Sequence, residues 1–391
     1  MTARRYFGDL KPVLQRVRLL YAAVPFFGVS TGALYPLIAL DLEARGIDAA
    51  FIGLVTSAYY AGSFAGSALF GGVIRRVGFR DAFAATAALA AVATWMLPAF
   101  DSEEAWLALR FLGGFAVGAY YVVIESWING LASKATRGRT FAMFEAIRLG
   151  ATAAGPALLV IGATHQAFFL VGAAYAIAMV PAMFAATAEH KEQTVNWRDV
   201  ACMFRCYPFA LALMALGGVL TASFYGLGAV YADRIGFSRD QIAWFVAVVL
   251  IAPALTQFPV GAAADRFGRL TVATVCVAVA GLSAAALAMG AGIGVAMVCL
   301  LAGLVSGLSQ PIYALGQGRV FDAIAKRELI AGATAGLVAY DIGAILGPAF
   351  VGRAVEAAGP SALYGIIAMI LFVAALLAVL DARAPRRCCT G

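Results

Sequence analysis

Charged side chains inside long apolar stretches are the residues of this sequence most able to do chemistry. Asp341 is the deepest acid, about two residues or ~3 Å from the middle of its stretch. Glu145 and Arg148 are one helical turn apart, so they can pair on one face of a helix. Arg110 lies about five residues inside another stretch. A charge at the centre of a bilayer costs roughly 2.5–3.5 kcal/mol, so such residues usually face a bundle interior or an aqueous cavity.

These residue types favour two kinds of chemistry. A carboxyl group removed from water, such as that of Asp341, favours its neutral form and can carry a proton. The guanidinium group of Arg148 can bind an anionic group of a substrate. The alternatives are a static pair of Arg148 with Asp341 or Glu145 that holds helices together, and an Arg110 side chain that extends to the membrane interface.

Tyrosine and glutamine side chains in the apolar stretches are candidates for lining a cavity. We single out Tyr35, Tyr59, Tyr340, Gln257, Gln310 and Tyr313. Gln310-Pro311 predicts a break in a helix, and broken helices tend to flank binding sites. The alternative for each tyrosine is anchoring at the membrane interface.

The stretches themselves predict membrane-spanning helices. The 391 residues are 63% hydrophobic and 13% charged, with a mean hydropathy of +0.89. Soluble domains are about 45–50% apolar and about 25% charged, which excludes that class. A span needs roughly 20 apolar residues. Twelve stretches fit: 18–41, 50–74, 82–100, 105–128, 140–163, 167–187, 207–232, 241–264, 271–290, 293–318, 331–354 and 361–381. The predicted fold class is an all-α membrane protein with twelve transmembrane helices.

The basic residues predict the orientation of these spans. Apart from Arg110 and Arg148, which lie inside spans, 22 lysine and arginine residues lie on the face that holds both termini. The opposite face carries four, which are Arg45, Arg234, Arg239 and Arg353. The positive-inside rule makes the first face cytoplasmic. The net charge of +7 is therefore a sign of topology, and we expect no nucleic-acid partner.

Sequence motifs for catalysis are lacking. No Gly-x-x-x-x-Gly-Lys-Ser/Thr loop occurs, so the chain has no Walker site to drive transport with ATP. No histidine and cysteine cluster has the spacing of a metal site. We expect no enzyme activity, no metal and no cofactor.

The chain is predicted to repeat internally. Gly71–Arg80 resembles Gly261–Leu270, and Gly155-Pro156 matches Gly347-Pro348 at nearly the same offset, close to half the length of the chain. The same division separates six spans from six. We expect an N-terminal six-helix bundle at 1–188, a cytoplasmic connector at 189–206 and a C-terminal six-helix bundle at 207–391. Parallel repeats of this kind place a binding site between them near the membrane midplane.

These motifs resemble those of the major facilitator superfamily over essentially the whole chain. Gly-x-x-Ala-Asp-Arg-x-Gly-Arg at 261–269 is similar to the signature loop of that superfamily, and Arg110-x-x-x-Gly114-x-x-x-Gly118 to its second signature. The resemblance implies two pseudo-symmetric bundles, with Arg148 and Asp341 approaching one cavity. It also implies a role for Arg110 in proton transfer.

The Gly-Pro pair in the fifth span is similar to the antiporter signature of the superfamily. Ala151 and Leu159 stand where that signature has glycine, which leaves the direction of transport open. Both Gly-Pro pairs, Gly155-Pro156 and Gly347-Pro348, are expected to bend their helices.

The resemblance further implies cytoplasmic gates. In the second half, Asp265 can form an ion pair with a nearby arginine and latch helices together in one state. In the first half, arginine replaces that aspartate, so this copy lacks its own acid. The alternative for both copies is positive-inside anchoring. Glu125 is expected to act as a gate acid or as a solvated charge at a helix end. The gate candidates are Asp265, Arg266, Gly268, Arg269, Arg75, Arg76, Gly78, Glu125, Arg137 and Arg139.

Together these features predict a monomeric secondary transporter of a small solute, coupled to protons. Glu125-Ser126, Arg137-Gly138-Arg139 and 74–79 are similar to a bacterial subgroup of the superfamily, which implies a multi-pass protein of the bacterial plasma (inner) membrane. The lipid bilayer, a small-molecule substrate and protons are the expected partners. An uncoupled facilitator and a membrane scaffold or sensor that moves nothing remain alternatives.

Overall fold

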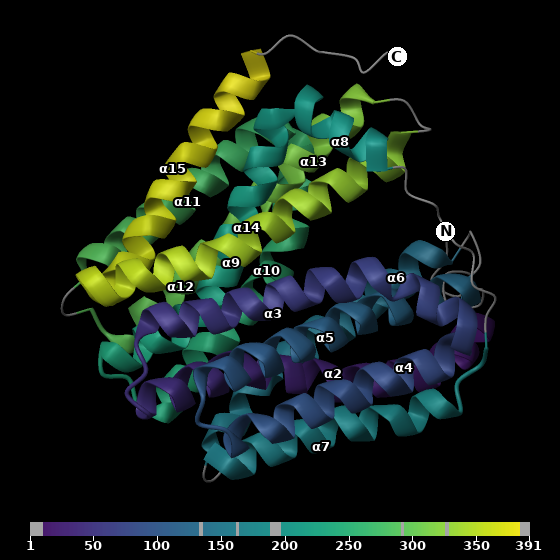
Figure 1. The fold of residues 1–391 in the computed structure, drawn as a ribbon. Coiled ribbons are helices and arrows are strands. Elements are labelled where there is room, and N and C mark those ends of the chain that lie inside the picture. Colours follow the sequence, from purple (N-terminus) through teal and green to yellow (C-terminus); the bar gives the residue numbers. More distant parts are fainter. Residues whose placement is uncertain are drawn as a thin grey trace. The chain divides into compact units, whose positions relative to one another are not determined.

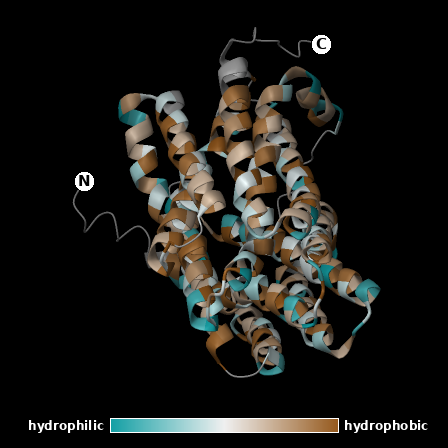
Figure 2. Ribbon diagram, turned by 90° about the vertical axis from the view of Figure 1, so that its left-hand side faces the viewer, coloured by the Kyte–Doolittle hydropathy of each residue, from teal (hydrophilic) through white to brown (hydrophobic). Residues whose placement is uncertain are grey.

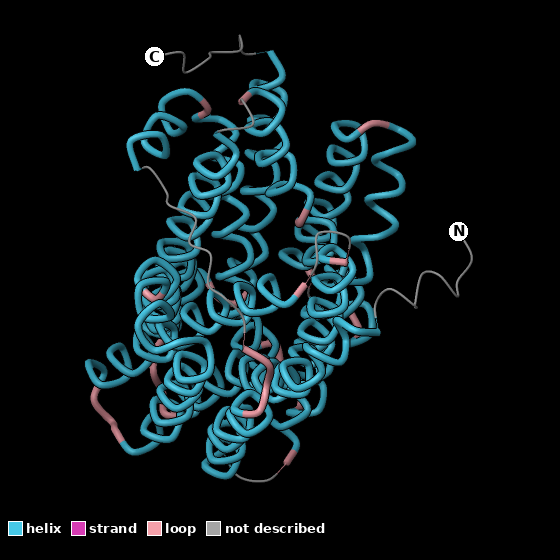
Figure 3. The backbone as a smooth tube through the Cα atoms, turned by 90° about the vertical axis from the view of Figure 1, so that its right-hand side faces the viewer, coloured by secondary structure: helices cyan, strands magenta, loops and turns pink. Residues whose placement is uncertain are grey.

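The elements of this protein are helices throughout the described ranges. The computed structural model describes residues 11–132, 136–161, 164–187, 197–290, 293–324 and 328–383 (Figure 3). Helices satisfy their own backbone polar groups, which a bilayer interior requires.

The helices follow the order of the predicted spans (Figure 1). The first half contains α2 (Lys11–Ala44), α3 (Ala49–Leu69), α4 (Gly71–Met96), η1 (Leu97–Ala99), α5 (Glu103–Leu131), α6 (Arg137–Ala154), η2 (Gly155–Val160) and α7 (Thr164–Met183). The second half contains α8 (Trp197–Cys206), α9 (Pro208–Arg234), α10 (Arg239–Phe267), α11 (Arg269–Met289), α12 (Val295–Ser309), α13 (Pro311–Ala323), α14 (Leu329–Ala358) and α15 (Ser361–Arg383).

Within the described residues, 10 helices are long and apolar enough to cross a membrane. Their ribbons are coloured mainly as hydrophobic along their length (Figure 2). α3 and α15 coincide with two of the twelve predicted spans but are not among these 10 helices. The count of twelve therefore stays a prediction.

The structure corrects the predicted loop after the second span. Arg75 and Arg76 lie in the first turns of α4, which begins at Gly71. The helix is interrupted only at Gly78, where φ is 82°. Glycine adopts this left-handed conformation without steric cost, so one residue makes the kink that a whole loop was expected to make.

Sharp turns recur at the predicted repeat interval. Gly46 and Gly236 both have positive φ, as do Gly78 and Gly268, and the members of each pair are separated by the same interval as the repeated motifs. The helices after the first pair of turns are capped at matching positions. Asp48 accepts a hydrogen bond from the Phe51 backbone N–H at 2.7 Å, and Ser238 accepts one from the Gln241 backbone N–H at 3.4 Å. The two repeats therefore have glycine turns and helix caps at matching positions.

The contacts divide the chain into two compact units. Unit 1 comprises Met1–Leu37 and Ala58–Glu192, and unit 2 comprises Ile38–Ser57 and Gln193–Gly391. Within unit 1, α4 packs along α5 and α7; within unit 2, α9 packs along α13, α14 and α15 (Figure 1).

Aromatic side chains fill the interior of each unit. In unit 1, Phe27 stacks on Tyr120 with ring centroids 3.5 Å apart, and its edge meets Tyr175 at 4.7 Å. In unit 2, Tyr231 and Tyr364 meet edge to face at 4.7 Å. These rings leave few gaps, so the polar groups near them are held in place.

Helices within each unit approach one another closely at glycine. In unit 1, a methyl group at Gly32 of α2 would collide with the backbone of Thr152 in α6. In unit 2, a methyl group at Gly218 of α9 would collide with the backbone of Tyr340 in α14. Small residues allow such contacts between helices in a membrane.

Gly32→Ala and Gly150→Ala test this packing with the same substitution on two helices. Gly32→Ala should destabilise the protein by about 1–3 kcal/mol, because the methyl group overpacks the contact with Thr152. Gly150 of α6 has nothing within 4 Å of the added carbon, so Gly150→Ala should be neutral or stabilise by up to about 1 kcal/mol. Unfolding of the detergent-purified proteins measures both, and equal effects would contradict the close approach.

Candidate functional site

A pocket of about 260 Å³, with both polar and apolar side chains in its lining, lies within unit 2. Its lining comes from α9, from α14 and from the junction of α12 and α13, and comprises Gly217, Leu220, Thr221, Ser309, Gln310, Tyr313, Leu337 and Tyr340. At the predicted break, α12 ends at Ser309 and α13 begins at Pro311, but Gln310 keeps helical φ and ψ of −55° and −36°, and Val295–Phe321 forms one span. Proline cannot continue the backbone hydrogen bonds of a helix, which frees polar groups at the pocket wall.

Three of the predicted cavity residues meet at this pocket. Gln310, Tyr313 and Tyr340 all line it, and the rings of the two tyrosines lie edge to face at 5.7 Å. Asp341 follows Tyr340 and is half-buried. Its carboxyl group interacts electrostatically with both tyrosines, and no described residue of unit 2 forms an ion pair with it. The acid is therefore next to a pocket and without a cation from its own unit.

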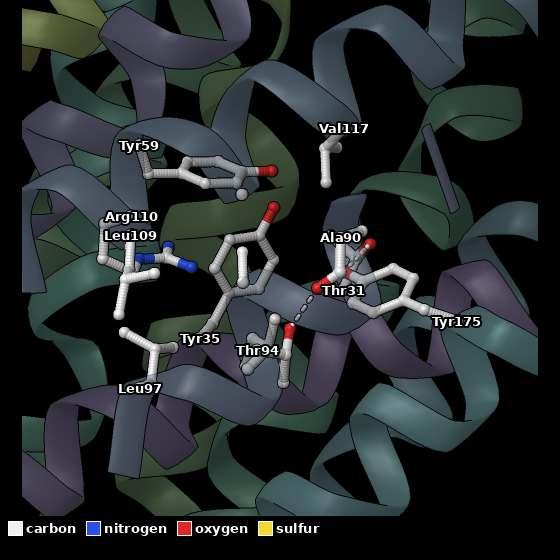
Figure 4. Close-up of a pocket in the computed structure, with 13 residues that line it drawn as sticks. Thr31, Tyr35, Tyr59, Ala90, Thr94, Leu97, Leu109, Arg110, Val117 and Tyr175 are labelled. Carbon is white, nitrogen blue, oxygen red and sulfur yellow. Dashed lines mark hydrogen bonds between the residues drawn. The ribbon is translucent and has the colours of Figure 1, made fainter. Parts of the chain in front are cut away.

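A second polar cluster lies in unit 1 around Arg110. Methyl groups at Gly114 and Gly118 of α5 would collide with the backbone of α3 at Tyr59 and Ser63. This close approach turns one face of α5 toward α3, and Arg110 is one turn earlier on that face. Its guanidinium carbon lies 4.5 Å from the centre of the Tyr59 ring. Tyr35 of α2 packs edge to face on Tyr59 at 6.3 Å. Three predicted site residues thus meet here (Figure 4).

The predicted pair of Arg148 and Glu145 is formed in α6. The Arg148 Nε donates to Glu145 Oε2 at 2.6 Å. The Arg148 guanidinium carbon also lies 5.7 Å from the centre of the Tyr121 ring. Glu125 of α5 interacts electrostatically with Glu145 and Arg148, which its sequence position did not predict. Among the described residues only Glu145 forms an ion pair with Arg148, so Glu125 is a second carboxyl group in the neighbourhood of this pair and not a direct partner of the guanidinium group.

The predicted gate residues make fewer contacts than expected. Asp265 and Arg266 lie in the last turn of α10, and in the described part of the chain they form no ion pair. Arg266 lies over its neighbour Phe267 at 5.2 Å. The Arg269 side chain is outside the described side chains. Gly268, with φ of 89°, separates α10 from α11.

The remaining predicted gate and cavity residues are exposed or half-buried. Arg76, Arg137 and Gln257 are exposed, and Gln257 does not line the pocket of unit 2. Arg75 is exposed and Arg139 is half-buried.

The two Gly-Pro pairs differ in their effect on the helix. α6 ends at Ala154, and Gly155-Pro156 begins the 3₁₀ turn η2, whereas α14 continues through Pro348. Both glycines allow close packing, Gly155 against α2 and Gly347 against Val219 of α9. Only the first pair therefore ends its α-helix.

Sequence reasoning missed the contacts of Arg80. Its Nε and Nη2 both donate to the Ala185 carbonyl, at 3.0 and 2.6 Å. Trp127 donates from Nε1 to the adjacent Ala186 carbonyl at 2.7 Å. These side chains satisfy carbonyl groups just beyond the end of α7. Arg80 thus links α4 to the segment that follows α7, which stabilises unit 1.

A charged network in unit 2 was also missed. Arg234 at the end of α9 donates to Glu43 at 2.7 and 3.3 Å and to Glu356 of α14 at 3.1 Å. Glu356 also accepts a hydrogen bond from the Ala49 backbone N–H at 3.0 Å, at the start of α3. The network joins the ends of four helices. Arg234 is one of the four basic residues on the face predicted to be extracellular, and that rarity was the available signal.

The fold and the sites define an integral membrane protein built from helices, with small pockets that mix polar and apolar side chains. Comparison with known sequences places it more narrowly. The model of the Major Facilitator Superfamily matches residues 20–238 and again residues 209–387. The starts of the two matches are separated by nearly the repeat interval. The chain belongs to the Major Facilitator Superfamily.

Known relatives agree with this assignment. The chain is 26% identical over 372 residues to the "Uncharacterized MFS-type transporter YcaD" of Escherichia coli (strain K12), covering 94% of this chain and 96% of the relative. The crystal structure of the D323A mutant of the nucleoside transporter NupG has a TM-score of 0.81 at 17% identity, covering 94% of this chain and 99% of the other. The D-xylose-proton symporter gives a TM-score of 0.72 at 14% identity, covering 95% and 98%. The homologues and the fold are those of transporters, which are not enzymes.

The Arg234 network can be measured with a double-mutant cycle. Glu43→Gln and Arg234→Gln, alone and combined, should give a coupling energy of about 1 kcal/mol, because both side chains are partly shielded and act in a network. The Asp41–Arg45 pair within α2 serves as the control, with a coupling of about 0.3–0.5 kcal/mol. Unfolding in detergent gives both values, and a coupling no larger than the control would contradict the network.

Proposed function

We propose that this chain is a proton-coupled secondary transporter that moves a small solute by alternating access. In this proposal it is a monomer with twelve spans and both termini in the cytoplasm, in the bacterial inner membrane. Two six-helix bundles at 1–188 and 207–391, joined by 189–206, rock around a site near the midplane. Membership of a transporter family supports transport, and the pocket of unit 2 supports a bound solute.

The observation that carries the proposal is Asp341 beside the pocket. The carboxyl group lies next to Tyr340, which lines that pocket, and has no cationic partner among the described residues of unit 2. A carboxyl group in such a place can take up a proton in one state and release it in another. Arg110 and the pair of acids at Glu125 and Glu145 are the proposed assistants in unit 1.

The lining favours a polar, uncharged solute. Thr221, Ser309, Gln310, Tyr313 and Tyr340 supply neutral hydrogen-bonding groups. A volume of about 260 Å³ lies just below the usual range of about 300–1,000 Å³ for ligand pockets, which suits a small molecule. Two similar folds are named for a nucleoside and for D-xylose with a proton, so nucleosides and pentoses are the first solutes to test.

Transport by reconstituted protein tests the coupling. In proteoliposomes with an inward proton gradient, the wild type should accumulate its solute above the outside concentration. Asp341→Asn should fall to simple equilibration, because a carboxamide carries no proton. Asp240→Asn makes the same change at an exposed position of α10 and should accumulate as the wild type does.

Three results would contradict parts of the proposal. Full accumulation by Asp341→Asn would remove Asp341 from coupling. Equilibration by the wild type itself, with no response to the gradient, would indicate an uncoupled facilitator. No movement of any solute would indicate a scaffold or sensor.

Ligand-induced stabilisation tests the pocket separately. A ligand that binds only the folded state raises the melting temperature by mass action. Gln310→Ala should weaken apparent affinity about fivefold to tenfold, because one hydrogen bond is lost. Gln257→Ala removes a glutamine outside the pocket and should bind normally. Equal affinities of the two variants would place the solute elsewhere, and stabilisation by organic acids that Arg148→Ala abolishes would move it to unit 1.

A further inference from the structure

Two adjacent glycines of α9 lie at the pocket of unit 2, and packing requires only one of them. A methyl group at Gly218 would collide with the Tyr340 carbonyl of α14. A methyl group at Gly217 would meet nothing closer than the Tyr313 Cβ at 3.7 Å, which is an ordinary contact. Glycine inside a helix is less stable than alanine. Packing therefore gives no reason for glycine at position 217, where the missing side chain keeps the pocket open.

The repeat shows what unit 1 has in the place of these glycines. At the repeat interval, Gly218 corresponds to Gly28 of α2. A methyl group at Gly28 would lie only 2.8 Å from the Ala151 Cβ of α6, so this glycine is also required by packing. Gly217 corresponds to Phe27. Both units therefore keep the glycine that packing needs, whereas a phenyl ring replaces the other one in unit 1.

The ring of Phe27 fills its place in unit 1 as part of an aromatic stack. It lies on the ring of Tyr120, with centroids 3.5 Å apart and an angle of 7° between the planes. Phe27 is only 1% exposed. Flat rings therefore fill, in unit 1, the place at which unit 2 has a pocket.

The second ring of this stack is absent from unit 2 as well. Gly118 brings α5 close to the backbone of α3, and Gly307 brings α12 close to the backbone of α10 in the same way. When these two glycines are aligned, Tyr120 corresponds to Ser309, which lines the pocket. Unit 2 thus has neither ring, and the space is left as a cavity of about 260 Å³.

The lining of the pocket suits the faces and the edge of a flat ring. Leu220, Leu337 and the ring of Tyr313 give apolar surface, against which the hydroxyl groups of a polyol would stay unpaired. The amide of Gln310 offers both donors and an acceptor. Ser309 donates to the Ser306 carbonyl at 3.1 Å, so its hydroxyl oxygen can accept a further hydrogen bond. The junction of α12 and α13 can therefore bind a polar edge.

We propose that the pocket of unit 2 binds its solute through one flat heteroaromatic ring with donor and acceptor groups on its edge, and that Gly217 is the residue that admits this ring. The inference rests on the proposed function, in which this pocket binds the transported solute. The ring takes the space that Phe27 and Tyr120 fill in unit 1, and its edge meets Gln310 and Ser309. Its faces contact the leucines and Tyr313.

Thermal unfolding of the purified full-length protein with matched probes tests the ring. Uracil and adenine present a ring alone, uridine and adenosine present the same rings with ribose, and D-ribose presents the sugar alone. At least one of the four ring probes should raise the melting temperature in a saturable way, and D-ribose should not. A larger shift with the nucleoside than with its base identifies a nucleoside as the source of the ring, and equal shifts identify a free base.

Two matched alanine variants locate the ring. Gly217→Ala and Gly281→Ala both place a methyl group 3.7 Å from its nearest neighbour, and Gly281 lies in α11, outside the pocket. Both variants should melt at or above the temperature of the wild type, because alanine favours the helix. Only Gly217→Ala should raise the half-saturating concentration of the ring probe, by about tenfold, because the methyl group takes part of its space.

Gly217→Phe tests whether the space has the shape of a ring. Its own phenyl ring should fill the pocket as Phe27 fills its place in unit 1, so the melting temperature without a probe should not fall. The shift caused by the ring probes should be abolished. If this variant does not fold, the two alanine variants decide.

Four outcomes would overturn the proposal. A shift with D-ribose as large as with the ring probes would exclude the ring but leave the solute pocket of the proposed function standing. No shift with any ring probe would also exclude the ring, and solute accumulation in proteoliposomes would still test transport. Equal losses of affinity in Gly217→Ala and Gly281→Ala, or normal binding by Gly217→Phe, would place the ring elsewhere.

Discussion

The close approach of helix backbones at glycine is the constraint on which the rest of this structure depends. Lipid provides no hydrophobic force between helices, so association relies on contact at short range. Gly114 brings α5 against α3, and Arg110, one turn earlier, then meets Tyr59. Gly218 brings α9 against the backbone of Tyr340, and so fixes the wall of the pocket in unit 2. The positions of the polar groups therefore follow from the positions of the smallest residues.

On this repeated scaffold the charges are not repeated. Unit 1 holds two buried or half-buried arginines of different kinds, since Arg148 pairs with Glu145 and Arg110 has no carboxyl partner among the described residues. Unit 2 holds an acid, Asp341, beside neutral hydrogen-bonding groups. Equal turns and caps in both halves show that the backbone tolerates either set. The two units therefore share one backbone arrangement but carry different charged groups.

The sequence predicted the structural features that depend on residues close together along the chain. Helical spacing was enough for the Arg148–Glu145 pair, and Gln310-Pro311 for the position at which α12 ends and α13 begins. Contacts between distant segments were not predictable, because hydropathy does not say which face of one helix meets which face of another. The networks of Arg234 and Arg80 belong to that class, and so does the place of Gln257 outside the pocket of unit 2. The predicted loop at 75–81 was wrong because charged residues in a helical turn and in a loop look alike in sequence.

The assignment of residues 38–57 to unit 2 means that the covalent halves of the chain are not its structural halves. Gly53 of α3 fits against the backbone at Pro348, and Ser57 accepts a hydrogen bond from the Ala349 N–H at 3.2 Å. A C-terminal fragment cut at the connector would therefore lack two helix ends that belong to its packing, along with the Glu43 partner of Arg234. In this chain a segment of the first repeat has become part of the interior of the second. The second half completes its packing only with material from the first, so the two copies are no longer separable parts.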